Sequence, residues 1–96
     1  MSISGGGIFV ERSAEVRRGA YILGPCYVCG NSVVEGGARI LPFSRIENSV
    51  ISRGAEVYAS TLISSKAGKS CTVGPYALLR GADIGDNCRV GDFVEI

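Results

Sequence analysis

Aliphatic residues recur every five or six positions along almost the whole chain, and this spacing constrains the fold more than any other feature. The aliphatic column comprises Val10, Val16, Ile22, Val28, Val34, Ile40, Ile46, Ile51, Val57, Leu62, Ala67, Val73, Leu79, Ile84, Val90 and Ile96. A second column, of small residues, lies two positions before each member from Val16 onward: Ala14, Ala20, Cys26, Ser32, Ala38, Ser44, Ser49, Ala55, Ser60, Ser65, Cys71, Ala77, Ala82, Cys88 and Val94. Such self-similarity is typical of repeat proteins, in which each turn of the chain packs on its neighbours.

Steps of six residues fit neither the period of a helix nor a long strand. Because side chains two apart on a strand share a face, each small residue and the following aliphatic residue are expected to point inward. Three such steps, joined by turn-forming glycine, proline and asparagine, make a triangular coil. The sequence therefore predicts an all-β protein: a parallel β-helix of about five triangular coils over residues 10–96, stacked at about 4.8 Å. Residues 1–9, with three successive glycines, are expected to form a flexible leader. The shortened, five-residue steps predict tighter corners; they end at Ile51, Leu62, Ala67 and Ile84.

Charge and hydropathy narrow the range of partners. The net charge is +1 and no run of five basic residues occurs, which argues against a nucleic-acid partner. The longest mostly apolar stretch, residues 20–29, is about half the length of a membrane span and contains Pro25. The N-terminal residues do not have the pattern of a signal peptide. We therefore expect a cytoplasmic protein with no membrane partner.

Four cysteines raise the question of a metal or redox site. Cys26, Cys71 and Cys88 fall in the small-residue column, where a buried thiol fits. Cys26 and Cys29 have the spacing of half a zinc site, but the chain has no second such pair and no histidine. We expect structural cysteines and no metal, with metal or redox chemistry as the alternative.

The aromatic side chains all lie off the inward column. Counting every third step places one row of residues along a single edge of the prism: Pro25, Phe43, Ser60, Tyr76 and Phe93. Phe43, Tyr76 and Phe93 are therefore interface candidates, since an exposed apolar row marks a contact surface; the alternative is that the rings only stack on one another. The chain ends at Ile96, an inward position, and we expect this open end to contact another copy.

The tract 73–96, VGPYALLRGADIGDNCRVGDFVEI, carries a more specific signal. It resembles the form VGPYAxLRPGAxIGxxVxVGNFVEIK of the bifunctional N-acetylglucosamine-1-phosphate uridyltransferase/glucosamine-1-phosphate N-acetyltransferase family, a hexapeptide-repeat family. Residues 46–67 resemble the coils before that segment. The resemblance implies a left-handed β-helix, a homotrimer, and acetyl transfer from acetyl-CoA to glucosamine 1-phosphate.

Residue by residue, the resemblance implies one site residue. The arginine of the LRP motif corresponds to Arg80 and would bind the sugar phosphate, for which a guanidinium offers forked donors; the alternative is a solvated arginine at a corner. The proline that should follow is absent, because the chain reads Leu79-Arg80-Gly81. The chain also has no histidine, the usual base for amine acetylation, and it ends before the lysine that follows the family's FVEI motif.

Two functions remain after these departures. The first is a non-catalytic β-helix module that serves structure or oligomerisation, with no catalytic residue and no cofactor of its own. The second is an acetyl-CoA-dependent sugar-amine N-acetyltransferase that other chains or further C-terminal residues complete. A metal-dependent hexapeptide carbonic anhydrase is excluded for want of histidine, and an ice-binding helix for want of threonine rows.

Overall fold

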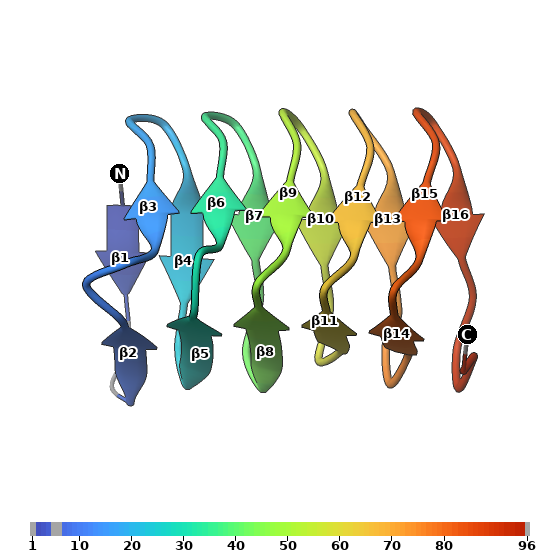
Figure 1. The fold of residues 1–96 in the computed structure, drawn as a ribbon, viewed down its shortest axis with the longest axis horizontal. Coiled ribbons are helices and arrows are strands. Elements are labelled where there is room, and N and C mark those ends of the chain that lie inside the picture. The colour runs from blue at the N-terminus through green and yellow to red at the C-terminus, as the bar shows by residue number, and fades with distance from the viewer. Residues whose placement is uncertain (1, 5–6, 96) are drawn as a thin grey trace.

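The described residues, 2–4 and 7–95 of a computed structural model, form a triangular prism of stacked parallel strands (Figure 1). The expected parallel β-helix of about five coils is confirmed, and its dimensions are 27 × 20 × 19 Å. Within these residues no helix is present that could cross a membrane.

Each side of the prism is one parallel sheet. Sheet A contains β1 (Ser2–Ser4), β4 (Tyr21–Leu23), β7 (Arg39–Ile40), β10 (Glu56–Val57), β13 (Thr72–Val73) and β16 (Arg89–Val90). Sheet B contains β2 (Ile8–Val10), β5 (Cys26–Cys29), β8 (Ser44–Glu47), β11 (Thr61–Ile63) and β14 (Leu78–Arg80). Sheet C contains β3 (Glu15–Val16), β6 (Val33–Val34), β9 (Val50–Ile51), β12 (Lys66–Ala67) and β15 (Asp83–Ile84).

The aliphatic column forms the core, as predicted. In sheet A, Ile22 pairs in register with Ile40, and Val57 pairs with Val73. The column is fully buried from Ile22 through Leu79, and Val90 is also buried. Val10, Val16 and Ile84 pack against this cluster while partly exposed. The alternation of inward and outward side chains therefore follows directly from the two-residue period of a strand.

The chain turns at three corners, which we name by the sheets they join. The A–B corner comprises residues 23–26, 41–44, 58–60, 74–77 and 91–94. The B–C corner comprises residues 11–14, 29–32, 47–49, 63–65 and 80–82. The C–A corner comprises residues 17–20, 35–38, 52–55, 68–71 and 85–88. All four predicted tight corners are present, and each contains one residue with a left-handed backbone: Asn48, Ala59, Ser64 and Gly81. The four-residue corners 41–44, 74–77 and 91–94 also contain at least one such residue each, so a left-handed residue is common to both corner lengths.

Interior serines complete the hydrogen bonding of the shortened corners. At the four-residue C–A corners 17–20, 35–38, 52–55 and 68–71, the N–H of the small residue donates to the carbonyl three positions back, as the Ala38 N–H does to the Glu35 carbonyl oxygen at 3.1 Å. At shortened B–C corners the N–H instead donates to a serine Oγ one coil earlier, at 3.1 Å in each case. The pairs are Ser49 to Ser32, Ser65 to Ser49, and Ala82 to Ser65.

Two expectations differ from the structure. β1 pairs with β4, and β2 pairs with β5, so β structure begins before the expected boundary at residue 10. A repeat that starts at Val10 leaves out Ile8, although Ile8 precedes Val10 by two residues and packs on the core. Gly5 and Gly6 of the expected leader lie outside the described residues. Cys88 is exposed, unlike Cys26 and Cys71, because the described chain has no coil beyond it to cover its thiol.

Candidate functional site

Arg80 lies at the end of β14, at the B–C corner, with its side chain exposed. Its Nη2 donates to Oε2 of Glu95 at 2.9 Å, and both side chains are more than half exposed. Glu95 reaches this position because Leu78 forms a parallel bridge with Glu95, one coil further along. A comparison of motifs does not reveal this pair, because the two residues come together only when outward positions one coil apart are aligned.

The departure from the family motif after Arg80 has a structural reason. Gly81 has a φ of 63°, and its N–H donates to the Ile63 carbonyl oxygen at 2.9 Å. Proline holds φ near −65° and has no N–H, so it fits neither requirement. The shortened corner therefore favours glycine directly after Arg80.

The interface candidates lie along the A–B corner and are strongly exposed: Phe43 by 74%, Tyr76 by 62% and Phe93 by 78%. The rings of Tyr76 and Phe93 stack, with centroids 5.3 Å apart and planes 15° from parallel. One member of the predicted row is wrong. Ala59 occupies this edge, and Ser60 is buried in the small-residue column, because the shortened corner moves each residue by one position.

Cys26 and Cys29 do not form a joint site. They lie three residues apart on β5, so Cys26 points into the core while Cys29 lies on the outer face. All four cysteines are free. Among the described residues no group of three or more histidine, cysteine or acidic side chains could hold a metal ion.

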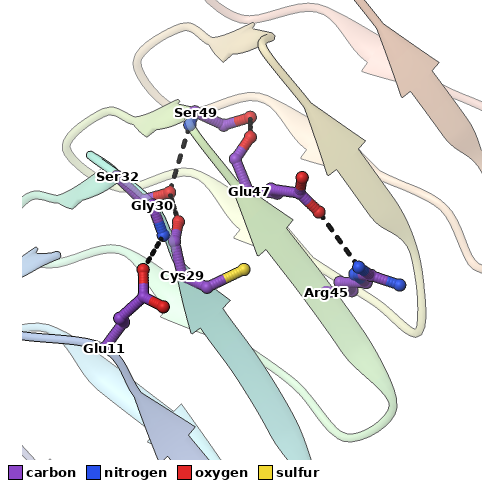
Figure 2. A network of polar contacts seen from close by, with 7 residues as sticks. All are labelled: Glu11, Cys29, Gly30, Ser32, Arg45, Glu47 and Ser49. Carbon is purple, nitrogen blue, oxygen red and sulfur yellow. Dashed lines mark hydrogen bonds and ion pairs between the residues drawn. The ribbon is translucent and has the colours of Figure 1, made fainter. Parts of the chain in front are cut away.

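Figure 2 shows Cys29 in a polar network on sheet B and its B–C corner, between Glu11 on one side and the Arg45–Glu47 pair on the other. Oε1 of Glu11 accepts the N–H of Gly30 at 2.8 Å, and Nη2 of Arg45 donates to Oε2 of Glu47 at 3.0 Å. Burial, and then the negative charges of Glu47 and Glu11, raise the pKa of the Cys29 thiol. The thiol is therefore protonated near neutral pH and is a poor nucleophile.

An aromatic pair lies beside this network. The rings of Phe9 and Tyr27 have centroids 5.0 Å apart, and the Arg45 guanidinium lies 5.8 Å from the Tyr27 centroid. A groove of about 330 Å³ runs over these residues. The groove was not predicted from the sequence; the signal for it is the in-register spacing of Phe9, Tyr27 and Arg45.

The chain is similar in sequence to part of one group of known proteins. It is 46% identical over 68 residues to the bifunctional protein GlmU of Clostridium novyi (strain NT), covering 70% of this chain and 15% of that protein. It is 36% identical over 90 residues to GlmU of Alkaliphilus oremlandii, and 37% identical over 90 residues to GlmU of a Nostoc species. Each of these two matches covers 93% of this chain and 20% of the relative. The chain thus spans a fifth or less of the length of these relatives. No family model and no solved structure matches it.

Proposed function

Because this chain belongs to the hexapeptide-repeat β-helix family and is related to part of the bifunctional GlmU proteins, we propose that it is a β-helix module of the acetyltransferase-domain type, non-catalytic as it stands. The observation that carries the proposal is the combination of complete repeats with the absence of histidine from all 96 residues. Loss of a positioned general base costs about 10²–10⁴-fold in rate. The module would serve structure and oligomerisation within the synthesis of UDP-N-acetylglucosamine.

An assay with acetyl-CoA and glucosamine 1-phosphate tests this proposal. We expect no acetyl transfer by the isolated chain above the uncatalysed rate. Transfer that is lost in the Arg80→Ala variant would contradict the proposal and support the alternative, an acetyl-CoA-dependent sugar-amine N-acetyltransferase completed by other groups. Adding a GlmU relative to the assay separates a chain that is inactive alone from one that contributes to a mixed assembly.

We further propose that Arg80 binds the phosphate of a sugar phosphate, as the resemblance implies. The support is its exposed guanidinium, whose one ionic partner among the described residues is the equally exposed Glu95. An exposed ion pair is weak, so a phosphate can displace the carboxylate. Glu95→Gln should therefore tighten glucosamine 1-phosphate binding, and Arg80→Gln should weaken it. Equal affinity in both variants and the unmodified chain would exclude Arg80 as the phosphate ligand.

We propose that the A–B corner is the contact surface of a homotrimer, supported by the exposure of Phe43, Tyr76 and Phe93 and by the family resemblance. We also propose a cytoplasmic location, supported by four free cysteines, which persist where thiols are kept reduced.

A further inference from the structure

A cleft of about 540 Å³ lies at the C–A corner, at the end of the prism that contains the first coils. Its lining comes from three successive coils: Arg17, Arg18 and Gly19 from the first, Glu35, Gly36 and Gly37 from the second, and Arg53 from the third. None of these residues belongs to the Arg80 corner or to the aromatic edge. The cleft is therefore a separate surface from the proposed phosphate site at Arg80 and from the proposed trimer contact.

The register of the strands explains why the cleft is open. Val16 pairs with Val34, and Tyr21 pairs with Arg39, so Arg18 lies opposite Gly36; the same count places Gly36 opposite Arg53. Arg18 and Arg53 are thus two coils apart, or about 10 Å at the usual strand spacing, with no side chain between them. A Cβ on Gly36 would come within 2.6 Å of the Arg18 carbonyl oxygen, so this position favours glycine and the gap stays empty.

The charges around the gap are unbalanced. Arg17 is paired with Glu15 at 2.6 Å. Neither Arg18 nor Arg53 has a carboxylate within 4.0 Å among residues 7–95. Glu35 is the one carboxylate in the lining, and its charge acts on Arg17. The exposed guanidinium groups of Arg18 and Arg53 therefore line the cleft without an ion-pair partner among residues 7–95.

The same corner, three coils further along, shows what this position binds when an anion is available. There Lys69 lies opposite Asp86, and the Lys69 main-chain N–H donates to the Asp86 carboxylate at 2.8 Å. Lys69 corresponds to Arg18, and Asp86 corresponds to Gly36. In the described chain the Arg18 N–H has no hydrogen-bond acceptor, because Gly36 offers no side chain.

We propose that this cleft binds a phosphate group of a small molecule. The phosphate takes the place that the Asp86 carboxylate occupies in the later coil: it accepts the Arg18 N–H and pairs with the guanidinium groups of Arg18 and Arg53. Phosphate suits two guanidinium groups that approach from opposite sides, because it presents several acceptor oxygens to their forked donors.

Titration of the full chain with inorganic phosphate, followed by backbone amide NMR, tests the proposal. We expect the Arg18 amide to shift along a saturable curve, and methyl phosphate to shift the same amide. Arg18→Gln and Arg53→Gln should each weaken binding about tenfold, as loss of a charge-assisted hydrogen bond predicts. Glu35→Gln should tighten binding, because it removes the one repulsive charge in the lining.

Two controls make the test decisive. Arg12→Gln removes the same charge from the B–C corner and should leave the affinity unchanged. Sodium chloride at matched ionic strength should not reproduce the Arg18 shift. A linear response that chloride reproduces, or an equal loss of affinity in Arg12→Gln, would overturn the proposal and assign the arginines to general solvation of the surface.

Discussion

The Oγ of Ser49 accepts the main-chain N–H of Ser65, one coil further along, at 3.1 Å, while its own hydroxyl donates to the Glu47 carbonyl oxygen at 2.8 Å. Both serines are buried. A side chain that appears to be only a small filler thus replaces the backbone acceptor that the shortened corner removes. An N–H buried without an acceptor is costly, so this relationship contributes to stability and register together.

Ser49→Ala should lower the free energy of unfolding by about 1–3 kcal/mol, because it leaves the Ser65 N–H buried and unpaired. Ser44→Ala is the matched control. Ser44 is equally buried, but its hydroxyl donates to the Leu41 carbonyl oxygen and accepts no main-chain N–H, so we expect about 0.5–1.5 kcal/mol. Urea unfolding of both variants measures the difference. Equal losses would mean that the accepted hydrogen bond contributes nothing beyond packing.

A pair of adjacent valines tests the inward register. Val34 is fully buried, whereas Val33 points outward on sheet C between Glu15 and Val50. Val34→Lys places a charge in an apolar interior without a partner and should cost several kcal/mol, a large part of the roughly 5–15 kcal/mol of a typical domain. Val33→Lys faces Glu15 and should change stability by about 0.5 kcal/mol or less. If thermal melts of the two variants coincide, the register is wrong by one residue.

Much of the architecture could be predicted from the two columns, because inward packing depends on residue size at fixed spacing. The three sheets and the members of sheet A from Ile22 to Val90 follow from counting every third step. Counting three residues beyond each member of sheet A failed at Ser60, because the corner 58–60 has one residue fewer, whereas the small-residue column correctly places Ser60 inside. Ala59 has the left-handed backbone of Phe43, Tyr76 and Phe93, and so occupies their position on the edge.

The candidate sites were less predictable, because outward side chains meet across coils and not along the chain. Arg80 and Glu95 are fifteen positions apart, and neither stands out without the register. The Arg18–Gly36–Arg53 stack is equally invisible to a search for basic runs. Once the coil length is known, the Arg80–Glu95 pair and the Arg18–Gly36–Arg53 stack both follow from aligning outward residues one coil apart.

The buried thiols predict a pH dependence. Burial raises the pKa of Cys71, and also that of Cys26, so the folded state keeps protons that the unfolded chain releases above the ordinary thiol pKa of about 8.5. Fewer protons on the unfolded chain mean that the free energy of unfolding falls as pH rises above about 8.5, and is unaffected by these groups below it. Unfolding measured from pH 7.5 to 9.5 should show a shallower fall for Cys71→Ala than for the unmodified chain. Cys26→Ala removes the other buried thiol and should also make the fall shallower; identical slopes in all three proteins would rule out the buried thiols as the cause.

Self-association through the A–B corner is the last expectation. The stacked rings of Tyr76 and Phe93 present a flat apolar surface that is costly to leave in water, and Phe43 extends the same edge two coils away. Sedimentation velocity at micromolar concentration should therefore detect a species larger than the 10.0 kDa chain, of trimer mass if the family resemblance extends to assembly. The double variant Tyr76→Ser/Phe93→Ser should shift the population toward monomer. Phe9→Ser, which removes an exposed ring from the face of sheet B, serves as the control and should leave assembly intact. If the unmodified chain is monomeric, the proposed interface is wrong. If only Phe9→Ser abolishes assembly, the interface lies instead at the groove beside Tyr27.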